Sequence, residues 1–188
     1  MPDVIARLRR DHQNVAQLLD LLAREVRRFE AGEQPYYDLI NDILEYIINY
    51  PDLFHHPLED AVLAQLKARA PATIADIGDL YDEHKKLGRL TRRFAAAVRN
   101  VTQDETLPRD WFVNVATDYL SFQRNHMQME EVVFFPAALK ALTVEDWQKI
   151  SEAPDRRGDP VFTADEPAVA DKYDRLREEI LSWGRQSA

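Results

Sequence analysis

The sequence predicts an all-α protein, an up-down four-helix bundle with a C-terminal helical extension. Only 5 of the 188 residues are glycine, roughly a third of average usage, which argues against a turn-rich β protein. Apolar residues recur at steps of three, four or seven along four long segments, which is the spacing of one helix face. With 45% hydrophobic and 30% charged residues, the composition is that of a folded globular protein.

The first helix is predicted over residues 3–30, because its apolar positions form a single seam. One vacancy in this seam is filled by a histidine, His12. Gly32 and Pro35 then break the helix. The apolar members of the seam are Ile5, Leu8, Val15, Leu19, Leu22, Val26 and Phe29.

A second apolar stripe runs from Ile40 to Val62 and contains His55. Pro51 and Pro57 interrupt this stripe. Each proline removes one backbone donor and crowds the carbonyl four residues before it. We therefore expect the helix to kink or restart near these prolines.

Two further helices follow, each with a histidine in its apolar seam. The third is predicted to open at Pro71 and carries His84. The fourth is predicted to take Pro108 into its first turn and carries His126. Pro136 is expected to end this fourth helix or to bend it late.

The remainder of the chain predicts a helical extension. Thr143 and Asp146 have the spacing of a helix start, and residues 154–167 are rich in proline, glycine and aspartate, which predicts a loop. We expect one four-helix domain over residues 1–142, and an extension over residues 143–188 packed on it. A last amphipathic helix is indicated by Tyr173, Leu176, Ile180 and Trp183.

Charge and cysteine content exclude several classes of function. The 24 basic and 33 acidic residues give a net charge of −9, which disfavours binding to a nucleic-acid backbone. The absence of cysteine excludes disulfides, thiolate catalysis and iron–sulfur clusters, so any metal must bind nitrogen and oxygen. No apolar leader or membrane span is found, so we expect a cytoplasmic protein that does not bind membranes.

Histidine and glutamate form a repeated pattern. Four of the five histidines fall at matching places in the four helical segments, and two of these four are followed four residues later by glutamate. The unit His…His-x-x-x-Glu therefore occurs twice, 71 or 72 residues apart, as expected for two helical hairpins related by an approximate twofold. The residues of this pattern are His12, His55, Glu59, His84, His126 and Glu130.

This pattern predicts a metal site in the core. Residues four apart share a helix face, so the six side chains meet in one layer if the four seams converge. Unpaired carboxylates in an apolar core cost several kcal/mol each, roughly, and a cation removes that cost. The twofold suggests two metals, each with two histidines, with both glutamates bridging and an oxo or hydroxo bridge between the ions. Oxidation with uptake of an oxo bridge leaves the site's net charge unchanged, which favours iron, although ligand type alone leaves manganese and zinc open.

Four sequence motifs carry a resemblance to a known family: RDHQN, FHHPLED, DEHKK and NHMQMEEVVFFP. In these motifs, residues 3–142 resemble the hemerythrin-like proteins, or HHE cation-binding domains. The resemblance implies a four-helix bundle around two non-haem iron ions, with the six residues above as ligands and Glu59 and Glu130 as the bridging carboxylates.

Gly88 stands where oxygen-carrying hemerythrins have a further histidine, which argues against a pure oxygen carrier. The chain is more similar to the two-glutamate branch of the family, which includes sensors and iron–sulfur repair proteins, although it lacks the cysteine-bearing segment of some repair proteins. We expect binding or sensing of oxygen, nitric oxide or peroxide in oxidative or nitrosative stress or iron homeostasis. The alternatives are a di-iron enzyme or repair factor, with peroxidase-like or nitric-oxide-reducing activity, and a purely structural bundle. Whether the chain has a protein partner is not indicated by the sequence.

The residues around the six are expected to have ordinary roles. His56 is expected at the surface or just outside the ligand set. Asp60 and Glu131 are expected to face water. Tyr81 and Tyr119 are expected to pack in the core with satisfied hydroxyl groups. A solvated face is expected for the basic cluster of Lys85, Lys86, Arg89, Arg92 and Arg93.

Overall fold

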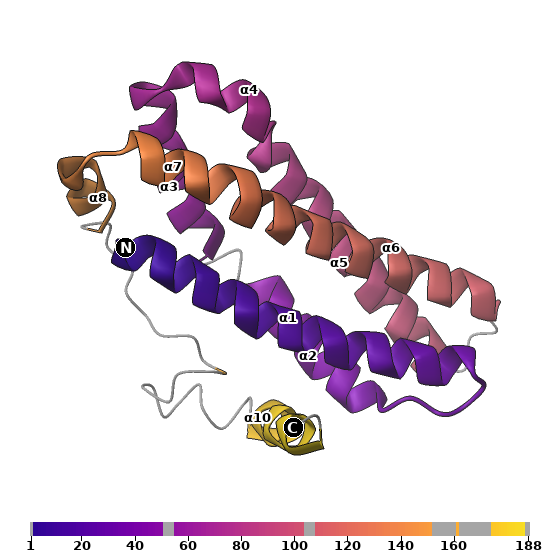
Figure 1. Ribbon diagram of the computed structural model, residues 1–188. Helices are drawn as coiled ribbons and strands as arrows, with labels where there is room; N and C mark the ends of the chain where they lie inside the picture. The colour runs from indigo at the N-terminus through magenta and orange to yellow at the C-terminus, as the bar shows by residue number, and fades with distance from the viewer. Residues whose placement is uncertain (1, 51–54, 104–107, 152–160, 162–173, 187–188) are drawn as a thin grey trace.

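The computed structural model confirms the all-α fold (Figure 1). It describes residues 2–50, 55–103, 108–151, 161 and 174–186. Three long helices are α1 (Asp3–Glu30), α5 (Leu80–Thr102) and α6 (Arg109–Met129), and α2 (Tyr37–Tyr50) and α3 (His56–Arg69) together supply the fourth segment. Helix α6 packs on α1 and α5, and α2 packs on the same two helices, so the four sides of the bundle close.

The first helix has the predicted bounds and ends at a glycine. Gly32 adopts a φ of 83°, a conformation that costs a residue without a side chain little. The N–H of Glu33 then donates to the carbonyl of Arg28 at 2.9 Å, which closes the end of the helix.

The second segment restarts at its prolines, as expected. Helix α2 ends at Tyr50 and α3 begins at His56, with Pro57 in its first turn, where a missing N–H costs no helical hydrogen bond. His55, just before α3, lies in a π-type turn. Pro51 lies outside the described residues.

The predicted start of the third helix at Pro71 is wrong. Pro71 opens a short 3₁₀ turn, η2 (Pro71–Thr73), which continues into the single-turn α4 (Ile74–Ile77). Gly78, with a φ of 79°, breaks the chain direction there. The long helix α5 starts only after Asp79, whose side chain accepts a hydrogen bond from the Asp82 N–H at 3.1 Å.

The fourth helix starts one residue after Pro108 and passes through a π-helical turn. Helix α6 continues into η3 (Glu130–Phe134) and then α7 (Phe135–Ala141). Pro136 has no N–H to donate to the carbonyl four residues before it, which accounts for the wider turn that precedes it. The predicted late bend at Pro136 therefore takes this form.

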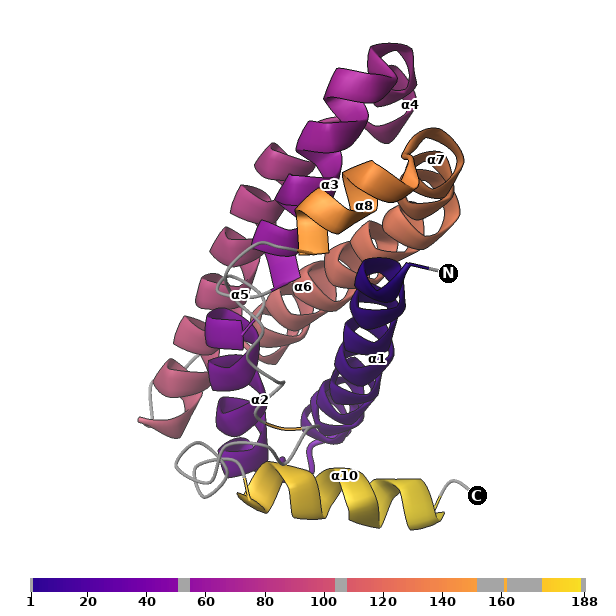
Figure 2. The same cartoon turned by 90° about the vertical axis from the view of Figure 1, so that its left-hand side faces the viewer.

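The C-terminal part of the described chain adds two helices. Helix α8 (Val144–Ser151) packs on α1 and α3, and the Thr143 and Asp146 side chains cap it as predicted. Helix α10 (Asp174–Gln186) contacts α2 and lies across one end of the bundle (Figure 2). The predicted loop lies outside the described residues except for Val161, as does Tyr173, and the division into two parts stays a prediction.

The bundle core consists of two apolar clusters. On α1, Leu8 belongs to one cluster and Val15 to the other, and on α5, Leu80 and Leu87 are divided in the same way. The predicted histidines lie between them on both helices. A polar layer therefore cuts across the core. Among the described residues, no helix has the length and apolar content needed to span a membrane.

Candidate metal centre

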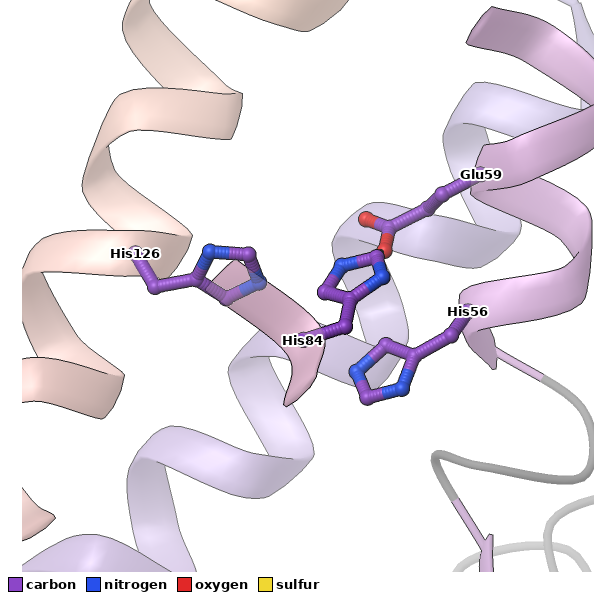
Figure 3. Close-up of side chains that lie close together, drawn as sticks. All are labelled: His56, Glu59, His84 and His126. Carbon is purple, nitrogen blue, oxygen red and sulfur yellow. The ribbon is translucent and has the colours of Figure 1, made fainter. Parts of the chain in front are cut away.

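The structure brings all six predicted residues into this polar layer. They come from α1, the start of α3, α5, α6 and η3, and all are buried, the two glutamates completely. Figure 3 shows the side chains of Glu59, His84 and His126 directed toward one another from three helices. The full set is His12, His55, Glu59, His84, His126 and Glu130.

Glu59 faces both pairs of histidines. Its Oε1 lies 3.2 Å from His55 Nε2 and 3.8 Å from His12 Nε2. Its Oε2 lies 3.3 Å from His84 Nε2. The two oxygens of one carboxylate are thus directed at different histidine pairs, as a bridging ligand requires.

Glu130 repeats this arrangement in the opposite sense. Its Oε2 lies 3.3 Å from His12 Nε2, and its Oε1 lies 3.2 Å from His126 Nε2 and 3.7 Å from His84 Nε2. The layer therefore contains two similar sets of four ligand atoms, and Glu59 and Glu130 each give one oxygen to both sets. One set has the imidazoles of His12 and His55, and the other has those of His84 and His126.

Carboxylates outside the layer hold three of the imidazoles in place. His55 Nδ1 lies 3.2 Å from Asp11 Oδ2, His12 Nδ1 lies 3.0 Å from Glu131 Oε1, and His126 Nδ1 lies 2.8 Å from Glu83 Oε2. A carboxylate accepts only, so each Nδ1 carries the proton and donates it. In the neutral ring, Nε2 then presents a lone pair to the centre of the layer.

With neutral imidazoles that carry their proton on Nδ1, the centre of the layer presents only acceptor atoms. Both oxygens of Glu59 and Glu130, together with His84 Nε2, have no hydrogen-bond partner within the part of the chain that the structure describes. In that state, lone pairs of carboxylates and imidazoles face each other at 3.2–3.8 Å, which is unfavourable in a buried site. A cation between them satisfies all of these atoms, so the residues fit a metal.

The ionisation of the layer points in the same direction. Burial lowers the pKa of His55, but the charges and hydrogen bonds of Glu59 and Asp11 outweigh it and raise the pKa well above its ordinary value. Burial also opposes protonation of His84, yet Glu130 and Glu59 raise its pKa to about 9. Burial disfavours the charged form of Glu59, but His55 and its neighbours hold its pKa well below the ordinary value. The layer thus stabilises positive charge, either as protons on its imidazoles or as a bound cation.

His56 is not at the surface but lies directly beside the six predicted ligands, which is the second of the two places expected for it. Its side chain is buried, and its ring stacks on that of His84 with centroids 3.9 Å apart (Figure 3). A nitrogen of His56 also lies within 4.8 Å of ligand atoms of Glu59, His84 and His126. In the sequence, the feature that points to a role for His56 is its position between His55 and Pro57.

Glu131 was expected to face water, but its carboxylate contacts other side chains, so this expectation is wrong. Besides His12 Nδ1, it accepts from Arg9 Nε at 2.9 Å, so it lies at the edge of the layer. Asp60 is exposed, as expected. The roles of Asp11 and Glu83 were missed, although each directly precedes a predicted ligand on its helix.

The two tyrosines differ from each other. Tyr81 is 59% exposed, so its expected core packing is wrong. Tyr119 is fully buried as expected, but its hydroxyl finds no hydrogen-bond partner among the described residues. Burial raises the pKa of this hydroxyl.

Comparison with known proteins identifies a family for most of the chain. The model of the hemerythrin HHE cation-binding domain matches residues 3–138, which include all of the polar layer. No curated protein and no solved structure matches the chain.

Proposed function

Because this chain belongs to the hemerythrin HHE cation-binding domain family, we propose that it holds two non-haem iron ions and uses them to bind or sense oxygen, nitric oxide or peroxide. One ion is assigned to His12 and His55, and the other to His84 and His126. Glu59 and Glu130 would contribute to the binding of both ions. The ions supply a reversible change of oxidation state and a coordination position for a small ligand.

The observation that carries this proposal is the set of four buried carboxylate oxygens without hydrogen-bond partners among the described residues. Each carboxylate directs its two oxygens at two different histidine pairs. A single ion on one side leaves the atoms of the other side unsatisfied. Two ions satisfy both sides, which supports a di-metal centre.

The protein's own residues prepare this site in two ways. Asp11, Glu83 and Glu131 hold protons on Nδ1, so that Nε2 is available as a ligand atom. The ring of Phe135 stacks on that of His12 with centroids 5.3 Å apart, and this contact covers the His12 side of the layer with an apolar group.

The occurrence of two glutamates, with glycine at position 88, supports a place in the two-glutamate branch of the family. We assign the protein to the response to oxidative or nitrosative stress or to iron homeostasis. Ligand binding or sensing is the leading function, because the six residues account for the metal centre and no further redox group is needed for a binding event.

Metal analysis tests the di-iron site. We expect about two iron ions per chain and near-ultraviolet absorption from an oxo or hydroxo bridge. The double variant His55→Ala with Glu130→Ala removes a ligand from the first set and a carboxylate shared by both, so iron content should fall below half. Asp76→Asn, an exposed change outside the polar layer, should retain full iron. Iron-free wild-type protein of unchanged stability would instead favour the structural bundle.

Rapid mixing distinguishes binding from turnover. The reduced protein is mixed with one equivalent of oxygen or nitric oxide, and absorbance is followed. A spectral change that persists and reverses when the ligand is removed is expected for binding or sensing. Repeated consumption of ligand in the presence of an electron donor would contradict this and favour the di-iron enzyme.

A further inference from the structure

A solvent-open cavity of ≈ 290 Å³ reaches the second histidine pair at His84. The other pair is covered where the Phe135 ring stacks on His12 and where the Arg9–Glu131 ion pair lies over His12 Nδ1. The two halves of the polar layer therefore differ in their surroundings, although their ligand atoms are similar. The cavity is lined by His56, Pro57, Asp60, Tyr81, His84, Lys85, Gly88 and Arg92.

Gly88 lies in the wall of this cavity, one helical turn after His84. A Cβ atom at this position would lie 3.3 and 3.4 Å from the two terminal nitrogens of Arg92. The guanidinium thus rests against the glycine in space that a larger residue would need. A glycine in the interior of α5 costs about 1 kcal/mol of helix stability relative to alanine, so the helix itself gives no reason for it.

The charged groups of the cavity favour an anion. Arg92 makes no ion pair or hydrogen bond with any residue in the described ranges. Lys85 Nζ lies 3.4 Å from Asp82 Oδ1 and 4.1 Å from the centre of the Tyr81 ring, so its positive charge is already partly compensated by these two groups. Asp60 is the one carboxylate among the lining residues. With neutral imidazoles, two cations and one carboxylate leave a formal charge of +1, and the available cation is Arg92.

We propose that this cavity admits and holds a small inorganic anion, such as azide, nitrite or hydroperoxide, next to the metal position at His84 and His126. The Arg92 guanidinium is the group that recognises its charge, and Gly88 keeps the passage open. A water molecule takes up about 30 Å³ in the liquid, so an anion of two or three heavy atoms fits together with several waters. This inference rests on the proposed function, because the anion's second partner is the metal.

Azide binding to the iron-loaded, oxidised, full-length protein tests the role of Arg92. Spectral titration of the wild type is compared with Arg92→Gln and with Arg89→Gln, an exposed change on the same helix outside the cavity lining. Loss of a charge-assisted contact should weaken azide binding about five- to tenfold in Arg92→Gln. Arg89→Gln should bind azide as the wild type does. Nitric oxide is neutral, so its binding rate to the reduced protein should be unchanged in Arg92→Gln.

The passage itself is tested by Gly88→Leu, with iron content measured on the same samples. Filling the cavity should slow the binding of both azide and nitric oxide at least tenfold while iron content stays at the wild-type level. Gly88→Ala, which favours the helix, should give a smaller slowing and guards against a folding defect.

The outcomes separate the two claims. Protein that takes up no iron overturns the proposed function and the anion site together. Iron-loaded protein whose azide affinity is equal in the wild type and Arg92→Gln, or falls equally in Arg89→Gln, overturns the anion site alone. So do unchanged binding rates in Gly88→Leu.

Discussion

Three carboxylates at the edge of the polar layer fix the direction of three of its four imidazoles. Asp11 and Glu83 precede His12 and His84 in sequence, and each accepts from a histidine of a neighbouring helix. The Asp11–His55 and Glu83–His126 contacts are therefore related to each other by the approximate twofold of the layer. Glu131 does not, because Asp60, which lies 71 residues before it, is exposed. The twofold is therefore broken at His84, on the side of the cavity.

This difference predicts unequal effects of two matched substitutions. Glu131→Gln removes the charge that holds His12 Nδ1–H, and loss of such a partner weakens metal binding about 10- to 100-fold. Asp60→Asn removes a similar charge at the related position without any contact to an imidazole. Iron retention against a competing chelator measures both. Equal retention in the two variants would show that the contact to His12 does not stabilise the site.

The six central residues were predictable because their spacing repeats, whereas the outer carboxylates were not. The chain has 33 acidic residues, so an aspartate or glutamate beside a histidine carries little information by itself. His56 required the backbone path near Pro57, which sequence spacing does not give. Its ring stacks on that of His84.

At the scale of elements, prolines determine where helices break but not how. The breaks near Pro57 and Pro136 were expected, and they are a restart and a π-helical turn. Pro71 was misread because proline also favours the first turn of short helices. Asp79 is the true N-cap of α5, and an aspartate directly before the helix is a signal that a capping analysis could have found.

Helix α8 is attached to the bundle by a charged contact. Arg69 of α3 donates from Nε and Nη2 to Asp146 of α8 at 3.0 and 2.9 Å. The contact with Arg69, and then the Thr143 N–H, lower the pKa of Asp146 from 3.8 to about 2. A carboxylate with a depressed pKa in the folded state stabilises that state above its ordinary pKa. The contribution is lost as pH falls from about 4 toward 2.

We therefore expect Asp146→Asn to lower the melting temperature at pH 7, and the difference from wild type to shrink as pH falls below about 4. Circular dichroism melts between pH 7 and pH 3 measure this, with exposed Asp76→Asn as the control. A difference that is constant or grows toward low pH would contradict the assigned role of the Asp146 charge.

At the scale of the whole molecule, the polar layer weakens the fold until a cation occupies it. It lies between two apolar clusters and contains carboxylate oxygens without hydrogen-bond partners in the described part of the chain. A ligand that binds only the folded state adds about 2.7 kcal/mol of stability at a hundredfold excess over Kd. Metal binding and folding are thus linked.

Iron loading should accordingly raise the melting temperature by roughly 5–10 °C for a chain of this size, and a chelator should reverse the change. Scanning calorimetry of loaded and metal-free protein measures the shift. In His55→Ala with Glu130→Ala the shift should be lost. An equal shift in that variant would mean that iron binds elsewhere.

The central claim is that two iron ions lie between Glu59 and Glu130, each held by one histidine pair. Anomalous diffraction from crystals of the iron-loaded protein, recorded on both sides of the iron absorption edge, tests it most directly. Two peaks roughly 3.5–4 Å apart are expected, one beside His12 and His55 and one beside His84 and His126. A single peak, or iron located outside this layer, would contradict the account.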